Sequence, residues 1–286
     1  MDGRTRGTLE MTGAMLISGT VGWFVLMAGQ PAATVVFWRC AFGALAMLVA
    51  CVLLGGFKTA IKPRQLLLAA VGGVALVVNW VLLFGAYSRA SIAVATVVYH
   101  TQPFMLVALG VLVFKERVNA RTWAWLAAAF MGLLLVVNGQ ANGPGDYLAG
   151  VAMALGAAFF YALTAAITKR LTGMPPHLIV LIQMAVGCVM LAPFAEVISA
   201  QPPVQTWACL LAIGLIHTGL MSTLLYGALQ KIPTALVGAL SFIYPVVAVL
   251  VDRLALGHSL SVGQYAGGVL ILAAAAGMTL QPKQRR

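Results

Sequence analysis

The sequence predicts an all-α integral membrane protein with ten transmembrane helices, arranged as two inverted repeats of five helices each. Three observations predict this class. First, 62% of the 286 residues are apolar, 8% are charged and the mean hydropathy is +1.00, whereas about a quarter of the residues of a soluble domain are charged. Second, the charges fall in short gaps between apolar runs that are long enough to cross a bilayer as helices. Third, one stretch of the chain occurs twice.

The repeated stretch covers residues 83–114 and 225–256, which align without a gap at a shift of 142 positions. Each copy is a short turn with one cation, followed by an apolar run with a proline in its middle. Pro103 thereby matches Pro245, and each lies 12 residues into its run, or about 18 Å of helix. That is about half of the hydrocarbon thickness. Matched proline-interrupted spans in two halves of a membrane protein indicate a transport site near the midplane.

The spans follow from the apolar runs between the polar gaps. We expect them at residues 8–28, 32–55, 65–88, 91–114, 120–138, 147–169, 177–198, 205–230, 233–252 and 259–280. The polar stretch 139–146, rich in Gly and containing a proline, is the expected linker between a first repeat, residues 1–138, and a second, residues 147–286. Because five is an odd number, the two repeats cross the membrane in opposite senses.

The positive charge indicates the orientation of the chain. The net charge is +11, and 14 of the 17 Lys and Arg residues fall on the side of the N-terminus, with Arg39, Arg89 and Arg253 as the exceptions. Cytoplasmic loops of membrane proteins carry such an excess. We therefore expect the protein in the inner membrane of the cell, with both termini in the cytoplasm. The charge is therefore explained without a nucleic-acid partner.

Two polar residues lie near mid-depth of matching spans. Asn79 is in the third span, and His217 in the eighth lies one helical turn from the position that matches Asn79. A buried Asn or His either joins two helices by a hydrogen bond or meets a ligand, and the sequence leaves both alternatives open.

The two prolines are candidate hinges, although a mid-span proline can also be a tolerated kink. A proline leaves the carbonyl four residues before it without its helical donor, and these carbonyls belong to Tyr99 and Ser241. Such carbonyls suit an ammonium group or a water. The sequence therefore predicts a central substrate cavity with aromatic walls, two imidazoles and an amide. Its expected residues are Trp23, Asn79, Trp80, Tyr99, His100, Tyr161, His217, Ser241 and Tyr244.

Arg39 is the one cation inside a span, about 12 Å beyond Pro31. Three roles fit it: snorkelling to the outer headgroups, pinning helices together, or meeting a substrate carboxylate.

Other classes of protein lack their signatures. The six acidic residues lie in loops or near span ends, which leaves His100 and His217 as the mid-membrane side chains that titrate near neutral pH. The sequence has no phosphate loop and no metal-ligand spacing, so we expect no enzyme, no metal and no other cofactor. The four cysteines lie in apolar runs and are interpreted as small core residues.

With these features the chain resembles the drug/metabolite transporter superfamily, in its EamA-type, ten-span branch. The resemblance covers nearly the whole length. It rests on the tandem five-span halves, on Arg39 in the second span, on GAYSRASIAVATVVYHTQPFMLVALGVLVFKERV in the first half and on YGALQKIPTALVGALSFIYPVVAVLVDRLALGHSLSVGQYAGGVLIL in the second.

The resemblance has one departure that bears on the substrate. In such families a mid-span proline is followed by an acid near a membrane face; Glu116 fits this pattern after Pro103, but His258 stands at the second acid position. Together with Tyr99 and His100, this departure is similar to the aromatic and neutral amino-acid exporters of the superfamily.

The resemblance implies a carrier that exports aromatic or neutral amino acids, or similar small metabolites, by alternating access. A multidrug or other metabolite exporter of the same superfamily and a channel-like facilitator are the alternatives. The expected partners are a small-molecule substrate and the lipid bilayer. The sequence leaves the oligomeric state open, and a monomer is compatible with it.

Overall fold

The computed structural model describes residues 2–58, 60–90, 95, 98–137, 147–194, 203–256 and 262–279, and these ranges contain helices, turns and loops but no strand. The predicted all-α class is confirmed. The elements are α1 (Gly3–Ala28), α2 (Ala32–Leu53), η1 (Gly56–Lys58), α3 (Pro63–Ala90), α5 (Gln102–Phe114), α6 (Ala120–Val137), α7 (Tyr147–Arg170), α8 (Pro176–Leu191), η2 (Ala192–Phe194), α9 (Val204–Gly214), η3 (Leu215–Leu220), α10 (Met221–Leu229), α11 (Thr234–Ser241), α12 (Ile243–Leu256) and α13 (Val262–Thr279).

The helices follow the expected spans, but the fourth, eighth and ninth spans are not continuous α-helices. The eighth consists of α9, the π-helical η3 and α10, where the sequence predicted one continuous helix. The ninth consists of α11 and α12, separated at Phe242. The linker 139–146 and His258 lie outside the described residues.

Both expected proline interruptions are confirmed. The fourth span turns at His100 and Thr101, and α5 then begins with Pro103 in its first turn. The ninth span turns at Phe242, three residues before Pro245. Proline lacks an N–H and disfavours a helical conformation in the residue before it, so each break falls on the N-terminal side of its proline. His100 and Phe242 match in the repeat, so the two breaks are at equivalent places.

The outer surface suits lipid. Five of the described helices are long and apolar enough to cross a membrane, and four shorter apolar helices accompany them. Large apolar side chains cover the outside of the bundle, among them Leu112 at 77% and Leu254 at 83% exposure. A soluble protein rarely exposes so continuous an apolar surface, whereas a bilayer covers it at no cost.

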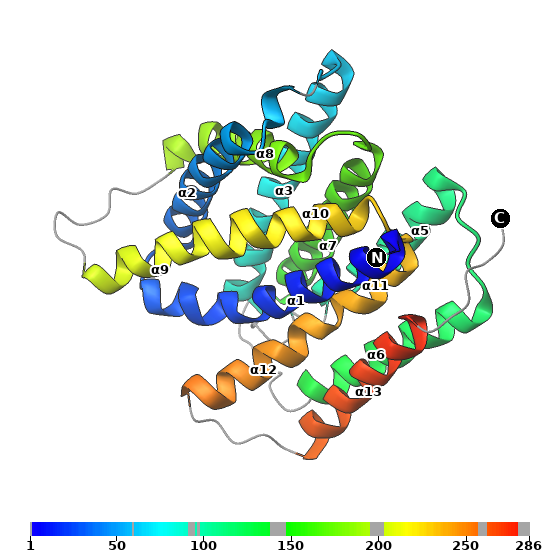
Figure 1. Ribbon diagram of the computed structural model, residues 1–286. Coiled ribbons are helices and arrows are strands. Elements are labelled where there is room, and N and C mark those ends of the chain that lie inside the picture. Colours follow the sequence, from blue (N-terminus) through cyan, green and yellow to red (C-terminus); the bar gives the residue numbers. More distant parts are fainter. Residues whose placement is uncertain are drawn as a thin grey trace.

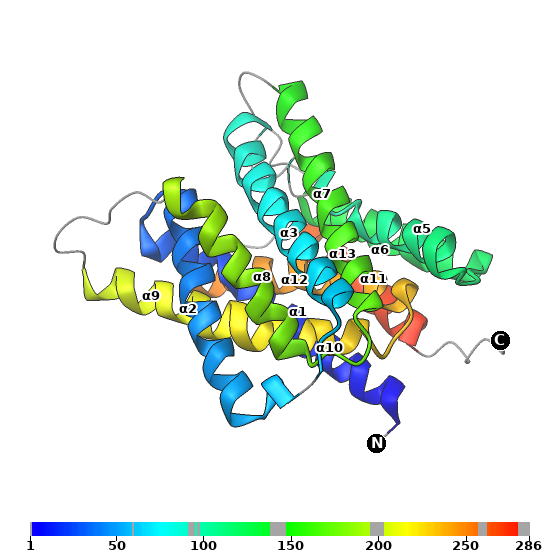
Figure 2. The same ribbon diagram turned by 90° about the horizontal axis from the view of Figure 1, so that it is seen from above.

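Helices of the two halves pack in equivalent pairs (Figures 1 and 2). The contact of α3 with α7 corresponds to that of α10 with α1, and the contact of α5 with α7 to that of α12 with α1. The pairs α2 with α8 and α6 with α13 join matching helices, and the contact of α5 with α11 joins the matching fourth and ninth spans. In Figure 1, α6 and α13 lie side by side and run in opposite directions.

Matching glycines allow equivalent close approaches. A Cβ atom on Gly43 of α2 would lie 2.7 Å from Cγ2 of Thr218 in the eighth span. The second and seventh spans align at a shift of 144, where Gly187 of α8 matches Gly43 and Gln183 matches Arg39. On Gly187 the Cβ atom would lie 3.3 Å from Cγ2 of Val77 in α3. Lipid gives no hydrophobic drive for helices to associate, so such close packing supplies part of the attraction between them.

Candidate functional site

The first group of candidate residues surrounds Asn79, which is fully buried in α3. Its Nδ2 donates to the carbonyl of Ala157 in α7 at 2.7 Å and to the Tyr99 hydroxyl at 3.3 Å. The Oδ1 atom is buried and has no hydrogen-bond partner among the described residues. Asn79 thus joins two helices, and it also keeps an acceptor for a ligand or a water, because a buried amide oxygen is costly to leave unpaired.

Aromatic rings continue this group to the two helix breaks. The Tyr99 ring centroid lies 6.1 Å from that of Tyr161 and 5.9 Å from that of His100. The His100 ring stacks on Tyr244, with centroids 5.4 Å apart and planes within 6°, and lies 6.1 Å from Phe242. We call Asn79, Tyr99, His100, Tyr161 and Tyr244 the central cluster.

Ser241 lies beside the central cluster at the end of α11. Its hydroxyl donates to the carbonyl of Gly238 at 2.7 Å and is therefore used within its own helix. Gly238 in turn lies against Pro103, since a Cβ atom there would be 3.2 Å from the proline Cβ. The two interrupted spans thus contact each other at one proline.

The second group surrounds His217, in the π-helical η3. Its Nε2 lies 2.7 Å from the Thr20 hydroxyl of α1, and its Nδ1 lies 3.3 Å from the carbonyl of Ala212. The Phe24 ring lies 4.8 Å from the imidazole, and the Trp23 ring lies 4.9 Å from Phe24. His217 therefore ties the eighth span to α1, as Asn79 ties α3 to α7.

Arg39 belongs to this second group. Its Nε donates to the Thr218 hydroxyl at 2.9 Å and its Nη2 to the His217 carbonyl at 3.2 Å. The guanidinium also lies over the ring of Trp80, 4.3 Å from the centroid. These contacts join α2, α3 and the eighth span, so of the roles predicted for Arg39, helix pinning matches the geometry.

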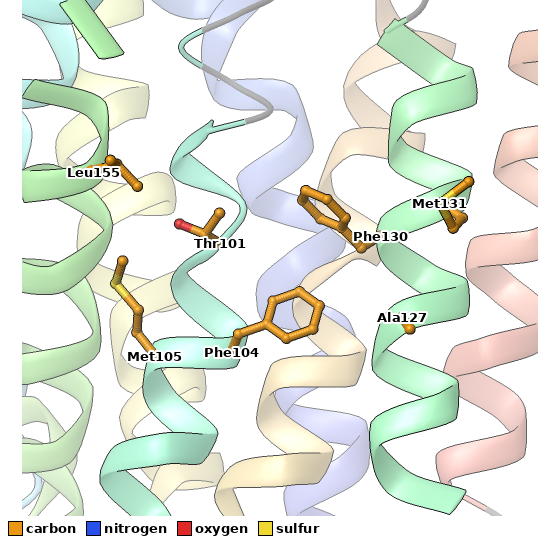
Figure 3. A pocket seen from close by; sticks show the side chains of 7 residues that line it. All are labelled: Thr101, Phe104, Met105, Ala127, Phe130, Met131 and Leu155. Carbon is orange, nitrogen blue, oxygen red and sulfur yellow. The ribbon is translucent and has the colours of Figure 1, made fainter. Parts of the chain in front are cut away.

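An apolar groove of about 540 Å³ lies between α5, α6 and α7. Figure 3 shows Phe104 of α5 and Phe130 of α6 between their two helices, with ring centroids 5.6 Å apart. The hydroxyl of Thr101, which also lines it, donates to the carbonyl of Val98. None of the candidate residues lines this groove.

An ion pair joins the two repeats where α5 ends and α11 begins. Lys115 has a left-handed conformation, φ 54°, and the N–H of Glu116 donates to the carbonyl of Gly110 at 3.1 Å, which ends α5. The Glu116 carboxylate accepts the N–H and the hydroxyl of Thr234, and it pairs with Lys169 at 3.2 Å.

This carboxylate caps a helix of the other repeat. Pro233 precedes α11 and provides no side-chain acceptor for the first N–H groups of that helix, so Glu116 takes this role. Lys169 also donates to the carbonyl of Ile232 at 2.8 Å. We call Glu116, Lys169 and Thr234 the latch. A second ion pair between the repeats, Glu10 with Lys231, joins α1 to the turn that follows α10.

A model of the EamA-like transporter family matches residues 5–138 and, a second time, residues 148–280. The chain belongs to the EamA-like transporter family. It is therefore a multi-span membrane transporter built from two repeated domains, and not an enzyme. A small-molecule substrate and membrane lipid are its partners.

Individual relatives of this EamA-family transporter extend over most of the chain. It is 28% identical to the uncharacterized transporter YxxF of Bacillus subtilis (strain 168), over 98% of this chain and 91% of the relative. It is 27% identical to a probable amino-acid metabolite efflux pump of Salmonella typhimurium, over 63% of this chain and 64% of the relative. A crystal structure with 21% identity shares the fold, with a TM-score of 0.85 and 97% of each chain covered.

Several residues of the EamA-family bundle carry contacts that the sequence did not predict. Thr20 and Thr218 hold the second group, and the Tyr226 hydroxyl donates to Oε1 of the buried Gln183. The repeat alignment offered one signal, because Gln183 matches Arg39. In the described part of the chain, no three His, Cys, Asp or Glu side chains gather as metal ligands.

Proposed function

We propose that this transporter is a carrier that exports aromatic or neutral amino acids, or similar small metabolites, by alternating access. The observation that carries the proposal is the central cluster. It gathers rings from the first and second repeats at both helix breaks, beside the buried, unpartnered Oδ1 of Asn79.

The cluster offers complementary chemistry to each part of an amino acid. Asn79 Oδ1 and the carbonyls of Tyr99 and Ser241 accept hydrogen bonds from an ammonium group. The rings of Tyr99, Tyr161 and Tyr244 pack on an apolar or aromatic side chain and attract the cation at their faces. His100 and His217 supply donors for the carboxylate, with Trp23 and Trp80 completing the walls. The amide hydrogens of Asn79 are already bonded to Ala157 and Tyr99, so Asn79 contributes only its oxygen.

The proposed motion rocks the repeat of residues 1–138 against the repeat of residues 147–286, with Pro103 and Pro245 as hinges. The opposite directions of α6 and α13 support an inverted insertion of the two repeats. The latch and the Glu10–Lys231 pair support a state that is closed on one side, because both join the repeats near the start of α1 and the ends of α5, α7 and α10.

We place the protein in the inner membrane of the cell. The closed side then faces the cytoplasm, and both termini lie on that side. The excess of Lys and Arg on this side supports the assignment. The likeness to the amino-acid metabolite efflux pump of Salmonella typhimurium supports the substrate class.

Flux of radiolabelled amino acids into proteoliposomes tests the proposal. We expect saturable uptake and counterflow for an aromatic or neutral amino acid. A drug or a sugar moving while no amino acid does would reject the substrate, and flux that never saturates would indicate a channel instead of a carrier.

A further inference from the structure

The eighth span contains a six-residue π-helix, η3, between two α-helical segments. Each π turn holds one residue more than an α turn, which is unfavourable in isolation and therefore persists only where neighbours hold it. Two side chains of η3 reach back five residues along their own span. Thr218 donates to the carbonyl of Ile213 at 2.9 Å, and His217 Nδ1 lies 3.3 Å from that of Ala212.

Arg39 provides the outside support for this segment. The Thr218 hydroxyl accepts from Arg39 Nε and donates to the carbonyl of Ile213 in the last turn of α9. It therefore links α2 to both ends of the junction between α9 and η3. The second guanidinium nitrogen binds the His217 carbonyl. Gly43, one turn after Arg39 on the same face of α2, brings that helix close, since its Cβ atom would be 2.7 Å from Thr218.

A plain ion-pair role does not account for these contacts. The three ion pairs that the described residues form do not include Arg39. Its two hydrogen bonds instead go to a hydroxyl and a carbonyl of consecutive residues, and the Trp80 ring fixes the plane of the guanidinium. A planar fork with several donors can hold two acceptors at once, whereas a lysine ammonium on a flexible stem cannot reproduce that geometry.

The register of η3 decides where His217 and the adjoining helix α10 point. Removing one residue from a helical turn rotates the remainder of the span by about 100°. In the present register the imidazole meets Thr20 of α1, and Leu224 of α10 faces Gly13 of α1.

We propose that Arg39 is a positioning residue of transport: it holds the π register of the eighth span and so aims the His217 ring and α10 at α1. The expected effect of Arg39 on transport rests on the proposed function. The register itself can be tested without any substrate.

The first test is a disulfide cross-link between Gly13→Cys and Leu224→Cys in a protein without its four native cysteines. A Cβ atom on Gly13 lies 3.7 Å from Leu224 Cδ1, so the pair reports how α10 faces α1. We expect Arg39→Lys and the milder, isosteric Thr218→Val to lower the cross-linking yield at least about threefold, as loss of one hydrogen bond predicts. The matched control is Thr8→Val, whose hydroxyl donates to the carbonyl of Arg4 at 2.9 Å, one turn back in its own helix α1. An unchanged yield in both test variants overturns the proposal.

The second test is transport in proteoliposomes. Arg39→Lys keeps the charge but loses the fork, and we expect turnover to fall about tenfold, which corresponds to one charge-assisted hydrogen bond. Thr218→Val should lower it in the same direction, with Thr8→Val near wild type. Normal turnover in Arg39→Lys would show that the charge alone suffices and would overturn the positioning role. If wild-type protein moves no amino acid, the proposed function fails while the cross-link result still decides the register.

Discussion

Removing the Glu116 carboxylate is expected to release the two repeats from each other at the latch. The carboxylate caps α11, and a helix cap contributes about 1 kcal/mol. It also pairs with Lys169 while the two side chains are 20% and 16% exposed, which favours the upper end of the range for such pairs, about 1 kcal/mol. Losing about 2 kcal/mol in Glu116→Ala changes the ratio of closed to open molecules about 30-fold.

Two further variants separate the cap from the ion pair. Glu116→Gln keeps an oxygen that accepts from Thr234 but loses the charge, so we expect about a fivefold change, since about half of the free energy remains. Lys169→Gln also loses the bond to the Ile232 carbonyl, so its effect should be at least as large. Arg121→Gln, in the first turn of α6 and exposed, is the control and should leave the ratio unchanged.

Distances between spin labels on the exposed Arg117 and Thr172 measure this ratio in lipid nanodiscs. These positions flank the latch on the first and second repeat. We expect a longer distance to gain population in Glu116→Ala and, less so, in the two single-charge variants. Identical distance distributions for wild type and Glu116→Ala would refute the reasoning, as would an equal effect of Arg121→Gln.

The helix contacts support three other predictions. Asn79→Leu removes the unpartnered oxygen and the tie to α7, and substrate flux should show KM raised about tenfold or more. Gly43→Ala forces a methyl group against Thr218 and should cost about 1–3 kcal/mol, seen as a lower Tm in detergent, whereas Gly22→Ala, with open space around it, should not lower Tm. Pro103→Ala restores a helical donor, so the transport rate should change more than Tm; an unchanged rate counts against a hinge.

The fold was predictable because its signals are local or repeated. Apolar run length gives the spans, and the two prolines give the breaks at His100 and Phe242, because proline acts on its own helix within one turn. The need of Asn79 for a hydrogen-bond partner was also predictable, since an amide in the middle of a span needs one wherever the helix lies.

The π register and the latch depend on residues far apart in the chain, which is why the sequence did not reveal them. Arg39 and Thr218 are 179 positions apart, and nothing in the apolar pattern of the eighth span differs from that of an α-helix. The cap of α11 comes from Glu116, which lies 118 positions before Thr234 in the chain. The sequence indicates only that Pro233 has no side-chain oxygen that could cap the helix.

The meeting of His100 with Phe242 has a consequence for how cargo is held. These residues occupy corresponding places in the two halves and face each other across the centre, one a polar ring and the other a hydrocarbon ring. If the cargo is the amino-acid zwitterion that we propose, like residues at these two positions would hold it in either of two equal orientations. We therefore expect the difference between His100 and Phe242 to favour one orientation of the cargo between the two halves.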